Sequence, residues 1–296
     1  MAGWDDVLKE IKETHTQQDY IRKKYLKNLY SYTNRNIIAY YSSWLDKPNV
    51  ENIDINDEDM NGFMNAAKGM NFTKGLDLIL HTPGGSPAAA EAIVKYLRKL
   101  FHNDIRIIVP QLAMSAGTMI ACAGKQIIMG YESSLGPIDP QFSGIPAYNI
   151  MKEFEDAKRD LEENPKNAQY WSIKLSRYPA AFMKNAIDAI ELSSELAKSW
   201  LGTCMFDKNK PKDLQKIDAI VSKLNEHNSS KAHDRHLDSD FCKSIGLKIY
   251  MLEDDRELQD AVLTLHHAYM ITLKTTSAIK IIESQNNKSY ISVINK

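Results

Sequence analysis

The sequence lacks the features that mark several common protein classes. Its 296 residues hold only three cysteines, Cys122, Cys204 and Cys242, with no CxxC pair, so neither a disulfide framework nor a zinc knuckle is expected. No apolar run approaches the roughly 20 residues that a membrane-spanning helix needs. The N-terminal residues also lack the basic and then apolar pattern of a signal peptide. We therefore expect a cytoplasmic protein with reduced thiols and no membrane partner.

An excess of charge of one sign is missing as well. The 37 Lys and Arg residues nearly balance the 38 Asp and Glu residues, and the net charge of −1 gives no whole-chain attraction to nucleic acid. The phosphate-binding patterns GxGxxG and GxxxxGK[ST] are absent. Residues 57–62 match the start of a calcium-binding loop, but Lys68 stands where a bidentate glutamate is required. We expect no nucleic acid partner, no cofactor and no metal.

Alternating strand and helix patterns fill the first half of the chain. Short apolar runs at 76–80, 105–109 and 125–129 predict strands, and residues 87–101 have the apolar spacing of a helix. The small-residue segment 113–121 follows the second strand. Such alternation predicts right-handed crossovers and a largely parallel sheet with flanking helices, which is an α/β fold.

The two ends of the chain are predicted to be helical extensions of one catalytic domain. Residues 1–34 are predicted to form an N-terminal helical arm, and residues 35–250 the catalytic domain. Residues 251–296 are predicted to form a C-terminal helical tail, with one helix that contains Leu258 and Tyr269 and then a polar end.

Two neighbouring glycines follow the first central strand. Gly84 and Gly85 lie directly after the strand that ends near His81, and glycines there let the backbone approach a ligand and turn N–H groups toward it. Two such N–H groups can hold an oxyanion. The alternative is a tight turn that leads into a helix.

Ser115 lies where a strand passes into a helix. Its neighbours are small, and the helix start offers free N–H groups that stabilise negative charge near the hydroxyl. A serine at this position can equally be a helix N-cap. The segment is not GxSxG, so it does not match the nucleophile elbow of α/β-hydrolases.

Taken together, HTPGG at 81–85, AMSAGTMIA at 113–121 and SSLGPIDPQ at 133–141 resemble the Clp-fold serine proteinases. The closest group is the serine dehydrogenase proteinase family, and the similarity extends from RNIIAYYSSWL at 35–45 to the region of His233. The resemblance implies a Clp/crotonase-like fold and a serine endopeptidase. It implies that Ser115 is the nucleophile, with an oxyanion hole made by Gly84, Gly85 and the N–H of Ala116.

The general base is assigned by the same resemblance. The family has a Ser, Asp, His triad in that chain order, and Asp139 and His233 correspond best to its last two members. In that triad, the histidine takes the proton from Ser115 and the aspartate fixes the tautomer of the ring. Asp139 precedes a proline and can instead start a turn, and a histidine in a polar stretch can simply be solvated.

Other bases remain open. His236 lies three residues beyond His233 and is a substitute for it. Signal peptide peptidases, which are related enzymes, use a lysine as the base. Lys174 is the lysine alternative here, followed by Lys152 and Lys158.

Three functions compete at this point. The first is hydrolysis of a peptide or protein substrate through an acyl-enzyme on Ser115. The second is a crotonase-type enzyme that binds an acyl thioester in the same oxyanion hole, and the third is a catalytically silent scaffold of the same fold. Because the resembling proteins assemble into rings or smaller closed sets, a homo-oligomer is expected.

Overall fold

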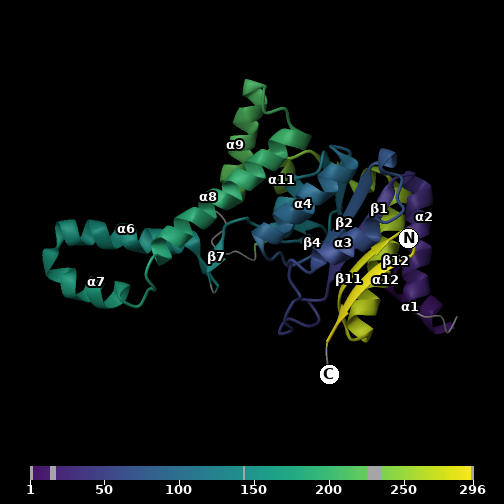
Figure 1. Cartoon of the computed structure of the whole chain (residues 1–296), viewed down its shortest axis with the longest axis horizontal. Helices are drawn as coiled ribbons and strands as arrows, with labels where there is room; N and C mark the ends of the chain where they lie inside the picture. Colours follow the sequence, from purple (N-terminus) through teal and green to yellow (C-terminus); the bar gives the residue numbers. More distant parts are fainter. Residues whose placement is uncertain (1–2, 14–17, 143, 226–234, 295–296) are drawn as a thin grey trace.

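A seven-stranded sheet forms the centre of the protein (Figure 1). The structure is a computed structural model that describes residues 3–13, 18–142, 144–225 and 235–294. Across the sheet the strands are β10 (Ile249–Met251), β5 (Gln126–Met129), β3 (Ile105–Val109), β2 (Leu76–His81), β1 (Asn36–Ser42), β11 (Ala278–Ser284) and β12 (Lys288–Val293). Neighbours among the first five strands pair in parallel, whereas β11 pairs antiparallel with both β1 and β12. The expected α/β fold with a largely parallel sheet is confirmed.

Helices cover both faces of this sheet. They are α1 (Trp4–Glu13), α2 (Gln18–Thr33), α3 (Asp59–Ala67), α4 (Pro87–Phe101), α5 (Ala116–Cys122) and α12 (Arg256–Thr275). Helices α3, α4 and α5 pack on one face, where Ile38 and Tyr40 of β1 point. Helices α2 and α12 pack on the other face, where Ile37 and Ala39 point, and α1 packs outside them. Both faces of β1 are therefore apolar, which explains its uninterrupted apolar run.

The C-terminal segment differs from the sequence prediction. The helix near Leu258 is confirmed as α12, but residues 278–293 form the β11–β12 hairpin and not a polar tail. Strand β11 pairs with β1 and is buried along its whole length. Lys280 and Glu283 are inside this strand, and each is paired with an opposite charge from a distant part of the chain. Because charged residues are usually exposed, these two buried charges make the strand look like a polar surface segment in the sequence.

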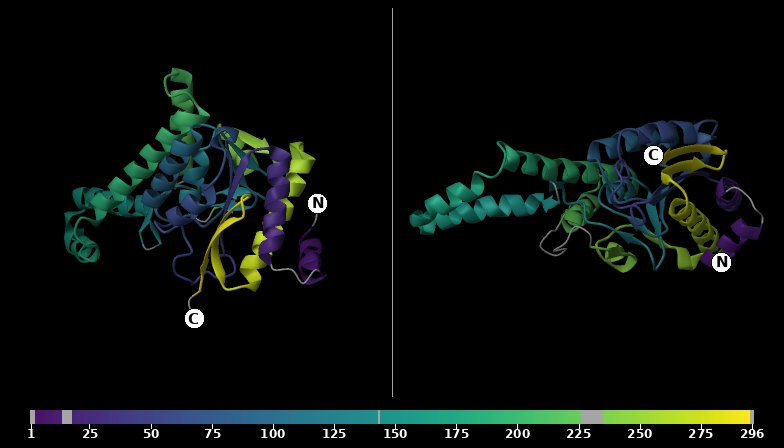
Figure 2. Two further views of the ribbon diagram at one scale, coloured as in Figure 1. Left: turned by 45° about the vertical axis from the view of Figure 1, so that its right-hand side comes forward. Right: turned by 90° about the horizontal axis from the view of Figure 1, so that it is seen from below.

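An arm of helices projects from the sheet (Figures 1 and 2). It consists of α6 (Ala147–Glu163), the 3-10 turn η2 (Pro165–Asn167), α7 (Ala168–Leu175) and α8 (Phe182–Trp200). After it come the π-helical turn η3 (Leu201–Met205), α9 (Pro211–Asn225) and α11 (Ser239–Ser244). Two further 3-10 turns are η1 (Phe72–Lys74) and η4 (Leu252–Asp254). Of the helices in the described ranges, none combines the length and the apolar character needed to cross a bilayer.

Two small sheets connect the arm to the centre. One contains β4 (Leu112–Ala113), β6 (Ser134–Leu135) and β9 (Leu237–Asp238), and the other contains β7 (Gln141–Phe142) and β8 (Ile145–Pro146). In the first, Ala113 pairs with Leu135, which pairs with Leu237. The chain therefore leaves β4 toward Ser115 at the same end of this sheet at which residues 235–236 enter β9, with β6 between the two strands.

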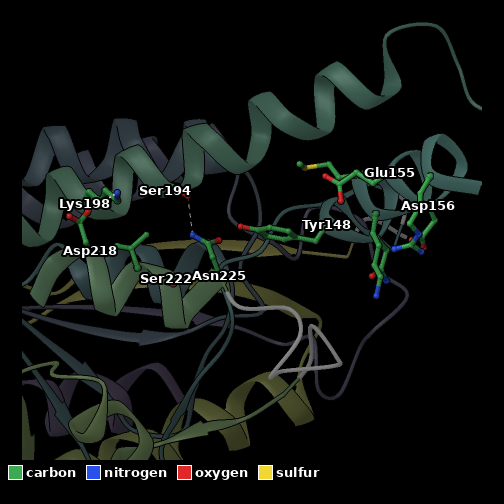
Figure 3. A pocket seen from close by; sticks show the side chains of 13 residues that line it. Tyr148, Glu155, Asp156, Ser194, Lys198, Asp218, Ser222 and Asn225 are labelled. Carbon is green, nitrogen blue, oxygen red and sulfur yellow. Dashed lines mark hydrogen bonds and ion pairs between the residues drawn. The ribbon is translucent and has the colours of Figure 1, made fainter. Parts of the chain in front are cut away.

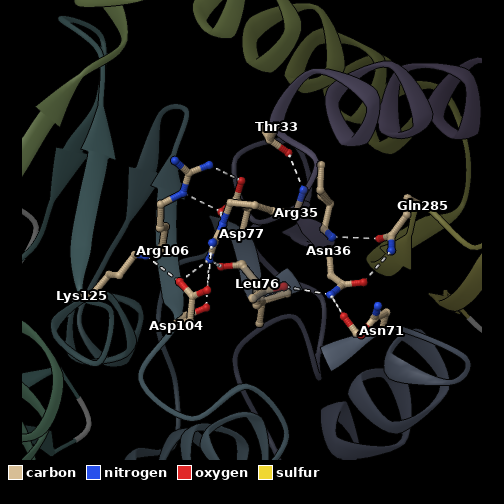
Figure 4. Close-up of polar contacts among 12 residues, drawn as sticks. Thr33, Arg35, Asn36, Asn71, Leu76, Asp77, Asp104, Arg106, Lys125 and Gln285 are labelled. Atoms are coloured by element: carbon tan, nitrogen blue, oxygen red, sulfur yellow. Dashed lines mark hydrogen bonds and ion pairs between the residues drawn. The ribbon is translucent and has the colours of Figure 1, made fainter. Parts of the chain in front are cut away.

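An ion-pair network closes the amino ends of the parallel strands (Figure 4). Asp77 is fully buried and receives the Nε groups of Arg35 and Arg106, each at 2.7 Å. Asp104 accepts from Arg35 (3.1 Å) and from Lys125 (2.5 Å). These hydrogen bonds, that of Arg35 foremost, lower the pKa of Asp104 to about 2. The network ties together the starts of β1, β2, β3 and β5.

Candidate active site

Two loops meet at the carboxyl ends of β2 and β3. The loop after β2 carries Thr82 to Gly85, and the loop after β3 runs through β4 to Ser115 and α5. The N–H of Thr82 donates to Leu112 O (3.0 Å), and the N–H of Met114 donates to Thr82 O (3.0 Å). This short parallel bridge fixes the glycine pair beside Ser115.

The backbone of Ser115 is strained. Its φ of 50° and ψ of −116° lie outside the regions that an L-residue occupies readily, which costs on the order of 1–3 kcal/mol. Ser115 stands at the N-cap position of α5, but its side chain makes no capping hydrogen bond. The side chain is partly exposed, and in the described chain its hydroxyl has no hydrogen-bond partner. The N-cap alternative therefore does not account for this serine.

The two glycines allow a close approach that no other residue would permit. A Cβ on Gly84 (φ 100°) would lie 2.7 Å from Ser115 Cβ and 3.0 Å from Ala116 N. A Cβ on Gly85 (φ 145°) would lie 2.4 Å from the backbone N and O of Ile55. Gly84 thus packs directly against the serine, and Gly85 packs against the segment that contains Ile55.

The N–H groups near Ser115 differ in availability. That of Gly84 donates to Thr82 Oγ1 (3.2 Å). Gly84 O accepts from Ile55 N (2.7 Å) and Ser86 N donates to Ile55 O (2.8 Å), so the N–H of Gly85 between them points away from Ile55. Within the described ranges, the N–H groups of Gly85 and Ala116 donate no hydrogen bond. These two are the donors open to an oxyanion, and Gly84 serves as the spacer between loop and serine.

Thr118 brings the segment after β6 to the site. Its Oγ1 lies 2.8 Å from Ala113 O and accepts from the N–H of Gly136 (2.9 Å). Beyond Gly136, Asp139 is completely buried. Burial, and then the charge of Asp139, raises the pKa of Tyr148, so this tyrosine lies near the carboxylate. Sequence analysis missed Thr82 and Thr118, although both lie within the HTPGG and AMSAGTMIA motifs.

His233 lies outside the described residues. The described chain on both sides of it is attached to the segment around Asp139. Before it, Leu224 O accepts from the N–H of Ile138 (3.0 Å), and after it, Leu237 pairs with Leu135. His236 is exposed and directly precedes β9, at the end of the small sheet at which the chain leaves β4 toward Ser115.

The lysine alternatives lie on the arm. Lys174 is on α7, at the outer end of the arm (Figure 1), and is paired with Glu153. This pairing, chiefly the hydrogen bond to Glu153, raises the pKa of Lys174, whereas a lysine base needs a lowered pKa. Lys152 and Lys158 are on α6. The fold of the single chain does not bring Lys174 to Ser115.

A cleft of about 660 Å³ lies between α6, α8 and α9 (Figure 3). Asn225 donates to Ser194 Oγ (3.1 Å) across it, and Lys198 pairs with Asp218 (2.7 Å). Tyr148 lines the end that is near Asp139. Over the described ranges, no group of three or more His, Cys, Asp or Glu side chains is arranged to hold a metal ion.

Comparisons with known proteins identify a family. A family model described as ClpP-like SDH-type serine proteinase matches residues 11–289. The uncharacterized protein MJ0137 of Methanocaldococcus jannaschii is 42% identical over 107 residues, which are 36% of this chain and 37% of that protein. The uncharacterized protein MJ1495 of the same organism is 40% identical over 79 residues, 27% of each chain. The matched segments thus span 37% of the first relative and 27% of the second.

Proposed function

Because the chain belongs to the ClpP-like SDH-type serine proteinases, we propose that it hydrolyses peptide bonds through an acyl-enzyme on Ser115. One observation carries the proposal: the Ser115 hydroxyl is uncommitted in the described chain and stands on a strained turn beside two N–H groups, of Gly85 and Ala116, that are also uncommitted. Strain and unused donors at one point are typical of a site that is organised for chemistry.

The reaction proceeds in two halves. Ser115 Oγ attacks the peptide carbonyl carbon, its proton passes to the base, and the carbonyl oxygen gains negative charge between the N–H groups of Gly85 and Ala116. The C–N bond then breaks, and the amine leaves with the proton from the base. Water attacks the ester carbonyl carbon as the base takes its proton, the bond to Ser115 Oγ breaks, and the base returns the proton to Oγ as the acid product leaves. Each oxyanion donor is worth about 100–1,000-fold in rate.

We assign the base to His233, with Asp139 holding its ring. The proposal is supported by the two attachments of the chain around residue 233 to residues 135 and 138, close to the buried carboxylate of Asp139. A buried carboxylate is suited to orient an imidazole and to stabilise its charged form. His236 is the alternative base, since it precedes β9 at the same end of the small sheet at which the chain leaves β4 toward Ser115, with β6 between the two strands.

Labelling with a fluorophosphonate probe tests the nucleophile. The wild-type protein should be labelled at Ser115, Ser115→Ala should not, and Ser172→Ala on the exposed side of α7 should be labelled like the wild type. His233→Ala and His236→Ala compare the two bases, and only the first should abolish labelling. Equal labelling of Ser115→Ala and wild type would refute the proposal. It would also favour a thioester enzyme, which uses a carboxylate instead of a serine.

The expected homo-oligomer remains a prediction. The arm exposes Tyr170 and Ile173 of α7, with 59% and 57% of their surfaces accessible, on the helix farthest from the sheet. Large apolar side chains exposed together often mark a protein interface. Sedimentation of the wild type and of a Tyr170→Ser, Ile173→Ser variant would measure whether this surface contributes.

A further inference from the structure

A group of buried polar side chains lies beneath the loop that carries Gly84 and Gly85. Lys280 comes from β11, Asp59 from the start of α3, Tyr40 from β1 and Thr82 from the loop itself. None of the four exposes more than 1% of its surface. None belongs to the proposed triad or to the oxyanion pair.

The first connection runs through residues 54–56. Lys280 Nζ donates to Asp59 Oδ1 (2.7 Å) and to Asp54 O (2.6 Å). The N–H of Asn56 donates to Asp59 Oδ2 (3.1 Å). The ion pair thus holds both neighbours of Ile55, whose own N–H and C=O bind the loop on either side of Gly85.

The second connection runs through Tyr40 and Thr82. The Tyr40 hydroxyl donates to Asp59 Oδ2 (2.8 Å). Tyr40 also forms a side-chain hydrogen bond with Thr82, which by itself lowers the pKa of Tyr40. Burial, and then the charge of Asp59, outweigh this effect and raise that pKa well above its ordinary value. Thr82 Oγ1 in turn accepts the N–H of Gly84. Both connections begin at Asp59 and end on the glycine loop.

Glycines cannot hold this loop in one orientation by themselves. A glycine peptide rotates more freely than any other because it lacks a Cβ. An oxyanion donor, however, must lie within about 0.5 Å of its productive position. With Gly84 N–H bound to Thr82 and Gly84 O bound to Ile55, the peptide planes around Gly85 are fixed. The buried network supplies the order that the glycines lack.

We propose that Thr82, Asp59 and Lys280 are positioning residues that fix the Gly85 N–H toward the oxyanion formed at Ser115. The inference rests on the acyl-enzyme function proposed above. It also gives the C-terminal hairpin a part in catalysis, because Lys280 reaches the site through two hydrogen-bonded steps. A buried ion pair adds little net stability over apolar residues of the same volume, so a role in fixing one conformation accounts better for its presence.

The same hairpin provides a matched control. Arg22 and Glu283 form a second buried ion pair, with Arg22 Nε 2.9 Å from Glu283 Oε2 and both side chains fully covered. Glu283 is on β11 like Lys280, but it points to the opposite face of the sheet, toward α2 and α12. Neither Arg22 nor Glu283 contacts residues 54–56 or 82–86 in the described chain.

The decisive experiment measures how fast a fluorophosphonate probe modifies Ser115, separated into reversible binding and the maximal rate of inactivation. Thr82→Val keeps the shape but loses Oγ1, and we expect its maximal rate to fall about 10–100-fold with unchanged reversible binding. Thr82→Ser keeps Oγ1 and should retain the wild-type rate. It should lower the thermal midpoint instead, because it removes the methyl group that packs against Gly117.

The ion pairs are compared in the same assay. Lys280→Met with Asp59→Leu should slow the maximal rate, whereas Arg22→Met with Glu283→Leu should leave the rate per folded molecule unchanged. Equal rates for Thr82→Val and wild type, or equal slowing by both double variants, would overturn the inference while the acyl-enzyme stands. If wild-type Ser115 does not react, the proposed function itself fails. If the Lys280 and Asp59 variant does not fold, the two Thr82 variants decide the question.

Discussion

The two ends of the parallel strands use the same sheet in opposite ways. At the amino ends, Asp77 and Asp104 have both carboxylate oxygens bound by Arg35, Arg106 or Lys125 (Figure 4). At the carboxyl ends, the described chain leaves the Ser115 hydroxyl and two backbone N–H groups without partners. The polar groups at the amino ends pair with one another and hold the strands together. Those at the carboxyl ends remain available for a ligand.

The backbone is strained at both ends of the strands. Asn34 (φ 51°), Gly75 (φ 66°) and His102 (φ 53°) precede β1, β2 and β3, and Gly84, Gly85 and Ser115 at the carboxyl ends have φ between 50° and 145°. Only the strain at the carboxyl ends lies beside the uncommitted hydroxyl and N–H groups. Such strain persists only where the surroundings impose it. At the carboxyl ends the surroundings are the bridge between Thr82 and Ala113 and the contact of Gly85 with Ile55. The two ends therefore differ in how their polar groups are paired and not in whether their backbone is strained.

The largest effect is expected for Ser115→Gly. Labelling and peptide hydrolysis should fall by a factor on the order of 10³ or more, because the nucleophile is lost. The free energy of unfolding should rise by about 1 kcal/mol, because glycine adopts the positive φ without strain. Urea unfolding measures the change in stability.

Ala181→Gly is the control, since Ala181 also has a positive φ (62°) but lies at the start of α8. It should stabilise the protein without loss of activity, and a loss there would show that relief of strain alone is harmful.

Gly84→Ala should reduce activity strongly by a different route. The added methyl group would meet the Met114 carbonyl and the Ser115 side chain at 2.7 Å, so the loop must move away from the serine. We expect at least about a 100-fold loss of labelling rate, comparable to the loss of an oxyanion donor. Gly69→Ala is the control, because Gly69 has a positive φ (80°) but no atom within 4 Å of a new Cβ. That variant should be destabilised by about 1 kcal/mol and remain fully reactive. If both variants lost activity equally, close packing at Gly84 would not be the cause.

At the other end of the strands, Asp77→Ala should reduce stability and spare the chemistry. It leaves Arg35 and Arg106 without their buried partner, which costs about 3 kcal/mol. Urea unfolding should show this loss, while the labelling rate of the folded protein stays at the wild-type value. A specific fall in that rate, at temperatures where the variant is folded, would contradict the division of labour between the two ends.

The sequence revealed those parts of the molecule whose signals are local. The runs at 76–80, 105–109 and 125–129 became β2, β3 and β5 because strands covered on both faces are apolar throughout. Strand β11 was missed because Lys280 and Glu283 look like surface residues until their partners, Asp59 and Arg22, are brought to them by the fold. Such pairings join residues more than 200 positions apart and leave no local pattern.

The candidate site also has parts that the sequence motifs reveal and parts that depend on the fold. The motifs pointed to Gly84, Gly85 and Ser115, but a serine before a helix is equally compatible with a cap, and only the backbone angles and the missing capping bond separate the two. The motifs do not predict that the Gly84 N–H already donates to Thr82 Oγ1, because this hydrogen bond depends on the Thr82 rotamer. Lys174 was considered because it follows Ser115 in the chain, and chain order says nothing about the arm that carries it away.

The smallest effect is expected from pH at the amino ends of the strands. The pKa of Asp104 is lowered from 3.8 to about 2, first by the Arg35 hydrogen bond, so its folded form is the stronger acid. This contribution to stability is complete above pH 4 and is lost as the pH falls toward 2. Because the side chain is 43% exposed, screening should keep it below about 1 kcal/mol. Asp104→Asn should therefore lower the unfolding free energy slightly at pH 6 and flatten its decline between pH 4 and pH 2. A variant with an unchanged slope in this window would mean that Arg35 and Lys125 find equal stabilisation without the Asp104 charge, and that Asp77 alone secures the amino ends.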